Sequence, residues 1–153
     1  MHYCVIKKND IANGPGVRVT LFVSGCDHHC KGCHNPQTWD PEAGQIFDNS
    51  AYEQIFEELS KDYVAGITIS GGDPLYMKNV KVIINLFFAI RRHFPDKTIW
   101  LYTGYTWEQL WYDDKFDIEM GIVENQWRRA LVTLCDVVVD GEYEESLHDV
   151  SLA

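Results

Sequence analysis

A loop with three closely spaced cysteines constrains this chain more than any other feature of its sequence. Cys26, Cys30 and Cys33 fall within eight residues, in the stretch SGCDHHCKGCHN at 24–35. The apolar run Val17–Val23 comes just before it and predicts a buried strand that ends in a glycine-marked loop. Thiolates bind soft metal centres, so the sequence predicts a metal site at a strand end.

Two kinds of metal centre suit this loop. A structural zinc site would take His28, His29 or His34 as its fourth ligand, but such sites commonly use two separated ligand pairs, and no second cysteine pair follows. A cubane iron-sulfur cluster is normally held by cysteines alone, and a loop that supplies three leaves one iron open to a non-protein ligand. The spacing favours the cluster, and zinc stays the alternative.

A longer string around these cysteines, NGPGVRVTLFVSGC-x3-CKGCHNPQTW, resembles the radical S-adenosylmethionine superfamily and, within it, the anaerobic ribonucleotide reductase activating proteins. Gly32 stands before the last cysteine, where many other superfamily members carry an aromatic residue. The resemblance continues through SGGDPL at 70–75, WLYTGYTWE at 100–108 and VVVDGEY at 137–143. It therefore covers nearly the whole chain.

The resemblance implies an activase that cleaves S-adenosylmethionine reductively at a 4Fe-4S cluster and makes a glycyl radical by hydrogen abstraction. It implies that the partner is the large subunit of anaerobic ribonucleoside-triphosphate reductase, with an electron donor such as flavodoxin. The implied cluster ligands are Cys26, Cys30 and Cys33. The implied contacts to the cofactor are Gly32, Cys33, His34, Gly71, Gly72 and Asp73. No catalytic residue is implied beyond the cluster and the cofactor.

Length limits the fold. A chain of 153 residues suggests a single domain, 1–153, and is shorter than the roughly 200 or more residues of a complete eight-stranded barrel. Any barrel must therefore be partial. Related activases usually continue with a polar tail that carries Arg and Asn, whereas this chain ends at Ala153 after the apolar Val150 and Leu152. We expect that tail to be missing.

Composition limits the classes of partner and the cellular location that fit this chain. A net charge of -10 argues against a nucleic-acid partner or an anionic membrane surface. No apolar run approaches the ~18 residues of a membrane span, and no signal-peptide pattern follows Met1. Five cysteines are an odd number, and three of them lie too close together for a secreted disulfide framework. This indicates a reducing compartment, and the cytoplasm is the expected location. Cys4 and Cys135 lie in apolar runs and are expected to be small buried side chains.

Strands and helices are expected to alternate. The expected strands are 2–7, 17–23, 66–70, 97–103 and 134–140. The expected helices are 50–59, 79–94, a short one from 104 or 106 to 111, and 126–131. The first of these helices is expected to begin with a Ser50-x-x-Glu53 capping box. The acidic stretch 113–119 is expected to be a solvated connection. This order predicts a parallel α/β sheet with right-handed crossovers. With the resemblance, the fold class is α/β, a partial parallel β/α barrel of the radical S-adenosylmethionine type.

The cysteines and the glycine-containing turns follow the ends of predicted strands. The cysteine loop, Ser70–Gly72, Thr103–Gly104 and Asp140–Gly141 all come after a strand's carboxyl end, the edge where parallel α/β folds build their sites. Absent side chains at Gly71 and Gly72 would let the backbone approach a ligand. By resemblance, this turn aligns the methionyl part of the cofactor, with Asp73 where many relatives have Glu.

The sequence leaves the roles of several arginines and histidines open. Arg18 fits either a solvated strand end or a place near the site, and Arg128–Arg129 fits an exposed helix face. His28 and His29 are adjacent and point in different directions, so at most one faces a metal and both can simply be solvated.

Two rival functions remain. One is a small-molecule radical enzyme such as a short deazapurine synthase, and the other is a non-enzymatic iron-sulfur or zinc protein.

Overall fold

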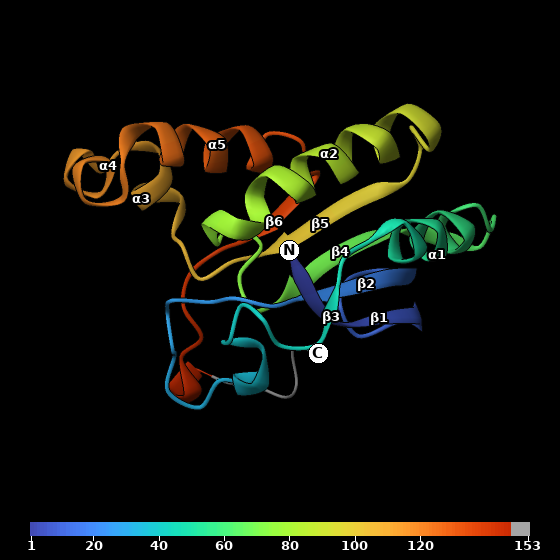
Figure 1. The fold of residues 1–153 in the computed structure, drawn as a ribbon, viewed down its shortest axis with the longest axis horizontal. Coiled ribbons are helices and arrows are strands. Elements are labelled where there is room, and N and C mark those ends of the chain that lie inside the picture. The colour runs from blue at the N-terminus through green and yellow to red at the C-terminus, as the bar shows by residue number, and fades with distance from the viewer. Residues whose placement is uncertain (148–153) are drawn as a thin grey trace.

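The structure is a computed structural model that describes residues 1–147 (Figure 1). Its strands are β1 (His2–Asp10), β2 (Val17–Val23), β3 (Gln45–Ile46), β4 (Val64–Gly71), β5 (Thr98–Tyr102) and β6 (Val137–Val139). Its helices are α1 (Asn49–Leu59), α2 (Met77–His93), α3 (Trp107–Trp111), α4 (Asp114–Met120) and α5 (Ile122–Val132), with short 3-10 turns η1 (Pro36–Thr38) and η2 (Glu145–Leu147). The chain end with Val150 and Leu152 lies outside the described residues.

The strands form one mixed sheet in the order β3-β1-β2-β4-β5-β6. β2, β4, β5 and β6 are parallel, as predicted, but β1 is antiparallel to β2, and β3 is antiparallel to β1. The prediction of a wholly parallel sheet was therefore wrong at this edge. The connection between β1 and β2 spans only residues 11–16, and a parallel crossover needs about a dozen residues or more.

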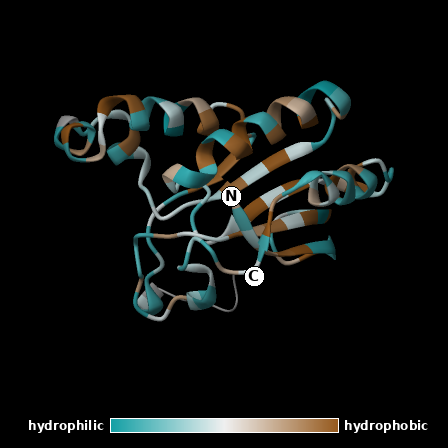
Figure 2. Ribbon diagram, viewed as in Figure 1, coloured by the Kyte–Doolittle hydropathy of each residue, from teal (hydrophilic) through white to brown (hydrophobic). Residues whose placement is uncertain are grey.

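The alternating strand positions place the core on one face of the sheet. Val19 and Leu21 of β2 and Ile67 of β4 are fully buried and belong to one cluster with apolar side chains of α1 and α2. Figure 2 shows the alternation as brown bands separated by paler ones along the strands. Because successive strand residues point to opposite faces, the neighbours of these residues line the other side of the sheet. None of the helices within residues 1–147 is both long and apolar enough to cross a membrane.

Two helix predictions needed correction. α1 begins at Asn49 with Asp48 as its N-cap, whose side chain accepts from the Ala51 amide, so the predicted capping box at Ser50 was wrong. The acidic stretch 113–119 is mostly helix α4 rather than a solvated connection. Asp113 caps it by accepting from two amides, and Phe116 packs into the core. Asp is as good an N-cap as Ser, and the wide choice of caps explains both errors.

Arg18 has a structural role that neither sequence alternative described. It is fully buried near the amino end of β2, whereas the cysteine loop follows the carboxyl end of that strand. Its guanidinium donates to both the hydroxyl and the carbonyl oxygen of Thr98, to Thr68 Oγ1 at 2.7 Å, to Ile67 O and to Pro15 O. The side chain therefore ties β2 to β4, to β5 and to the 11–16 connection.

Arg18→Met should lower the free energy of unfolding by about 3 kcal/mol, because buried oxygens lose their donor and cannot reach water. Arg18→Lys should recover only part of this, since an ammonium group cannot reproduce the guanidinium fork. Urea unfolding of the reduced, metal-free protein measures the difference. Arg92→Met, at an exposed position of α2, is the control and should stay within about 0.5 kcal/mol of the unsubstituted protein. Equal losses in Arg18→Met and Arg92→Met would contradict this role.

Candidate iron-sulfur and cofactor site

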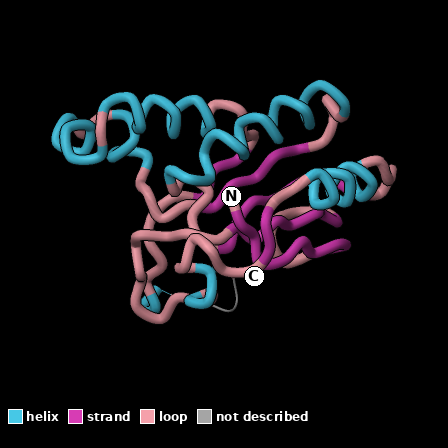
Figure 3. The backbone as a smooth tube through the Cα atoms, in the orientation of Figure 1, coloured by secondary structure: helices cyan, strands magenta, loops and turns pink. Residues whose placement is uncertain are grey.

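The loops that follow β2, β4, β5 and β6 converge on one edge of the sheet (Figure 3). They surround a cavity of about 570 Å³, a volume within the range of small-molecule sites. Its lining includes Cys26, Cys30, Cys33, the 70–73 turn, residues 102–104 and residues 139–144. The predicted convergence of glycine-marked loops at the carboxyl ends of the parallel strands is therefore confirmed.

Backbone hydrogen bonds hold the cysteine loop at this edge. The Gly25 amide donates to Thr38 O at 2.8 Å and the Cys26 amide donates to Trp39 O at 3.2 Å, so the two ends of the loop are joined. Within the loop, the Cys33 amide donates to Cys30 O at 3.2 Å. All three cysteines are free thiols.

The donor set fits an iron-sulfur cluster. Burial raises the pKa of Cys26 to about 11, so this thiol stays protonated at neutral pH until a metal displaces its proton. Within residues 1–147, no three His, Cys, Asp or Glu side chains converge closely enough to hold a single metal ion. A cubane cluster does not require that convergence, because its thiolates bind different irons.

The glycines after β4 allow two loops to approach backbone to backbone. The Gly72 amide donates to Val23 O at 2.8 Å, and the Asp73 amide donates to Gly25 O at 2.7 Å. A Cβ on Gly72 would lie 2.5 Å from Gly25 O and 2.9 Å from Thr38 O. Gly71 has a φ of 106°, a conformation that favours glycine. The turn is thus fixed against the residue that precedes Cys26.

The Asp73 carboxylate is the hub of this edge. It is almost fully buried and accepts from the amides of Leu75 at 2.7 Å and Gly104 at 2.9 Å, and from Thr103 Oγ1 at 2.9 Å. His28 Nε2 lies 2.9 Å from Asp73 Oδ2. These contacts give the carboxylate a bonding role between loops, in addition to its place in the cavity lining.

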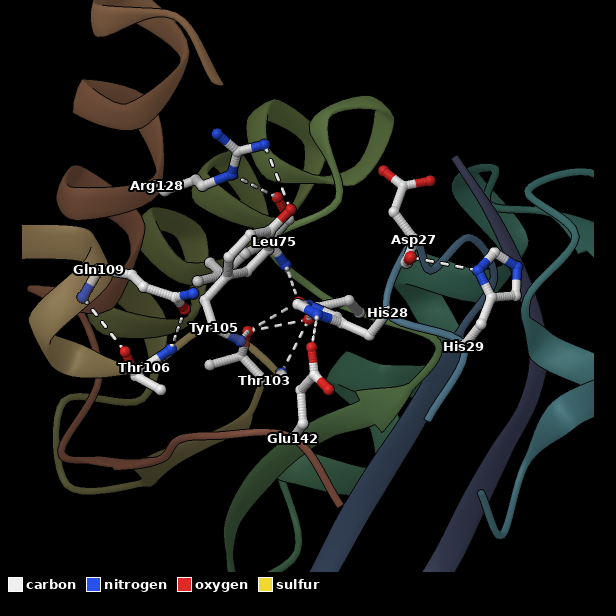
Figure 4. A network of polar contacts seen from close by, with 12 residues as sticks. Asp27, His28, His29, Leu75, Thr103, Tyr105, Thr106, Gln109, Arg128 and Glu142 are labelled. Carbon is white, nitrogen blue, oxygen red and sulfur yellow. Dashed lines mark hydrogen bonds and ion pairs between the residues drawn. The ribbon is translucent and has the colours of Figure 1, made fainter. Parts of the chain in front are cut away.

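His28 is the residue that the sequence reasoning missed. Its side chain is 11% exposed rather than solvated, and its ring nitrogens face Asp73 Oδ2 and, at 3.3 Å, Glu142 Oε1 (Figure 4). Burial alone would lower the pKa of His28, but the hydrogen bonds and charges of Asp73 and Glu142 outweigh it and raise the pKa. His29 instead stays exposed, with its ring 4.7 Å from that of Trp39.

Arg128 supports the same region from α5. The expectation of an exposed Arg128 was wrong, because it is 1% exposed and its Nε donates to Leu75 O at 3.0 Å. Its guanidinium lies 4.9 Å from the ring centre of Tyr105, which in turn meets the ring of His28 edge-on at 4.6 Å. Burial raises the pKa of Tyr105 to about 12, although the Arg128 charge opposes the shift. Tyr105 therefore stays a neutral phenol.

The remaining predicted cofactor contacts lie in two places. Cys33, Gly71, Gly72 and Asp73 line the cavity. His34 packs its ring 4.6 Å from the ring of Tyr143. Gly32 has a φ of 75°, and a Cβ there would lie 3.2 Å from Glu145 Cδ. Gly32 and His34 therefore lie where the segment after β6 packs against the cysteine loop.

Comparisons with known proteins point to an iron-sulfur family. Residues 12–153 match the family model described as a 4Fe-4S single cluster domain. The anaerobic ribonucleoside-triphosphate reductase-activating protein of enterobacteria phage T4 is 42% identical over 147 residues, which cover 96% of this chain and 84% of that protein. The proteins of the same name from Haemophilus influenzae and Escherichia coli K12 are 37% and 40% identical, with 99% of this chain and 90% and 91% of theirs covered.

Proposed function

Because this chain belongs to the family of anaerobic ribonucleoside-triphosphate reductase-activating proteins, we propose that it generates a glycyl radical on that reductase by means of a 4Fe-4S cluster and S-adenosylmethionine. One observation carries the proposal. Three cysteine thiols and a glycine turn from a neighbouring parallel strand line the same cavity. A cluster held by three cysteines leaves one iron open, and the molecule that binds this iron must lie beside the cluster in the same cavity.

The residues have separate roles in this proposal. Cys26, Cys30 and Cys33 hold the cluster and leave one iron free of protein. A cluster held there would supply the electron for reductive cleavage of S-adenosylmethionine, and the cleaved cofactor would supply the acceptor for a hydrogen atom of the target glycine. The Gly71–Gly72 backbone would hold the methionyl part of the cofactor, and Gly32, Cys33, His34 and Asp73 would complete its surroundings. The chain's contribution is to bind, orient and exclude water.

We extend the proposal to the fold and the setting. The parallel strands β2, β4, β5 and β6, with the site at their carboxyl ends, support a partial barrel of the radical S-adenosylmethionine type, and residues 1–153 form one such domain. An incomplete barrel leaves a side through which a segment of the large reductase subunit can enter. We also propose flavodoxin as the electron donor and the cytoplasm as the location, because free thiols suit a reducing compartment.

Isotope transfer tests this function. The large reductase subunit is prepared with glycine deuterated at the α carbon and mixed anaerobically with the reconstituted protein, a reductant and S-adenosylmethionine. We expect a glycyl radical by electron paramagnetic resonance and deuterium in 5'-deoxyadenosine, because the adenosyl fragment takes the α hydrogen directly. Unlabelled subunit is the matched control. The isolated protein should cleave the cofactor only slowly, since the partner completes the site.

The rival functions give different results in this experiment. Cofactor cleavage without deuterium transfer would show that the glycine is not the hydrogen donor and would favour a small-molecule radical enzyme. No 5'-deoxyadenosine at all, with a fully loaded cluster, would favour a non-enzymatic iron-sulfur protein. Stoichiometric zinc in place of iron would favour the zinc reading.

A further inference from the structure

His28 belongs to the cysteine loop, but its side chain joins that loop to the other three loops of the site. Its Nε2 is 2.9 Å from Asp73, which follows β4, and its Nδ1 is 3.3 Å from Glu142, which follows β6. Its ring packs over Gly104, which follows β5. Figure 4 shows the imidazole between Thr103, Tyr105 and Glu142.

Gly104 shows that space is reserved for this imidazole. A Cβ on Gly104 would lie 2.5 Å from His28 Cδ2 and 2.7 Å from its Nε2. Gly104 is not among the glycines with positive φ, so a left-handed backbone does not require glycine there. The missing side chain at this position is therefore explained by contact with His28 and not by the turn.

Asp73 does not depend on His28 for its own place. Its carboxylate accepts from the amides of Leu75 and Gly104 and from the hydroxyl of Thr103. The turn after β4 thus presents a fixed acceptor, and the bond from His28 adds the cysteine loop to it. A charge-assisted hydrogen bond of this kind is stronger than a neutral one and holds its donor more tightly.

We propose that His28 is a positioning residue for the site described above. This inference rests on the proposed function. The imidazole fixes the stretch between Cys26 and Cys30 relative to the Gly71–Asp73 turn. The cluster ligands and the backbone that binds the cofactor then keep one relative position. His28 itself binds neither iron nor S-adenosylmethionine. Glu142 bonds the second ring nitrogen and so orients the ring from the outer side.

The test uses two variants that remove the contact from opposite sides. His28→Ala deletes the ring, and Gly104→Ala leaves His28 in the chain but occupies its space. His29→Asn is the matched control, because it changes the neighbouring histidine and Asn tolerates the positive φ of 51° at that position. The proteins are reconstituted anaerobically. The measurements are iron and sulfide content, and the dissociation constant of S-adenosylmethionine by equilibrium dialysis.

We expect normal iron and sulfide content in every variant, because no cluster ligand changes. The affinity for S-adenosylmethionine should fall about tenfold in His28→Ala and in Gly104→Ala, which corresponds to about 1.4 kcal/mol, and should stay unchanged in His29→Asn. The double variant should lose no more than either single one, since both remove the same contact. His28→Gln, which can still donate to Asp73, should recover part of the affinity. In the metal-free proteins, amide hydrogen exchange across residues 27–32 should quicken in the two Ala variants only.

Three outcomes would overturn the inference. Unchanged cofactor affinity in His28→Ala would show that the contact does not position the site. Loss of iron in His28→Ala alone would make His28 a ligand. Equal losses in His29→Asn would mean that any change in the loop has the same effect. If the unsubstituted protein failed to bind S-adenosylmethionine, the proposed function would fail instead, so the two failures are distinguishable.

Discussion

Cys30→Ala should abolish assembly of the 4Fe-4S cluster, and Cys26→Ala and Cys33→Ala should do the same. The three thiols line one cavity, and the loop that carries them is short, so the loss of one leaves too few protein ligands for a stable cubane. The measurement is iron and sulfide content after anaerobic reconstitution, together with the electron paramagnetic resonance signal of the reduced protein. We expect the signal to disappear.

The chain supplies its own controls for this experiment. Cys135 packs against the hydrophobic core, where burial raises the pKa of its thiol to about 12, and Cys4 Sγ lies 3.3 Å from Ser24 Oγ. Within the described residues, neither lines the cavity. Cys4→Ala and Cys135→Ala should therefore retain full iron and sulfide. A full cluster in Cys30→Ala would refute the ligand assignment.

Gly72→Val should abolish the response of the cluster to S-adenosylmethionine. The backbone at Gly72 could no longer approach the methionyl group, and its new Cβ would lie 2.5 Å from Gly25 O, beside Cys26. Because backbone atoms cannot move aside cheaply, we also expect a lower iron content than in the unsubstituted protein. Even Gly72→Ala should be impaired, since the clash begins at the Cβ. Electron paramagnetic resonance with and without the cofactor measures the response.

Gly141→Ala is the control for this glycine. Gly141 also follows a parallel strand and lines the cavity, but a Cβ there would meet no atom within 4 Å. Its φ of 93° makes the substitution strained, at a cost of about 1 kcal/mol, without moving a neighbouring loop. Iron content should therefore stay normal. A folded Gly72→Val protein with unchanged cofactor affinity would show that the glycine serves only the turn.

Local patterns were enough to predict the part of the site that lies on successive strand ends. Apolar, β-branched runs located β2 and β4, and the glycines after them located the loops that meet. The antiparallel edge was missed, although the short connection at 11–16 indicates it, since a parallel crossover needs about a dozen residues or more. β3 was missed because a strand of only Gln45–Ile46 carries no periodic signal.

The buried polar residues could not be predicted for a different reason. Arg18, His28 and Arg128 are residue types that are usually exposed, but partners far away in the sequence bury Arg18 and Arg128 and leave the His28 side chain only 11% exposed. The partners of Arg18, for example, lie 50 and 80 residues further along the chain. Only the tertiary arrangement of strands, helices and loops brings such residues together. Gly104 was a signal in the sequence that a side chain packs there, but a glycine alone does not show which side chain occupies the space above it.

The contact between His28 and Glu142 joins residues that are 114 positions apart, and it closes the site with one of the last described segments of the chain (Figure 4). At translation rates of about 5–20 residues per second, this stretch takes on the order of ten seconds to synthesise. During that time the three thiols are present without the loop that covers them. Iron delivered before residue 142 has emerged would meet an open, oxidisable loop, which favours cluster insertion after translation.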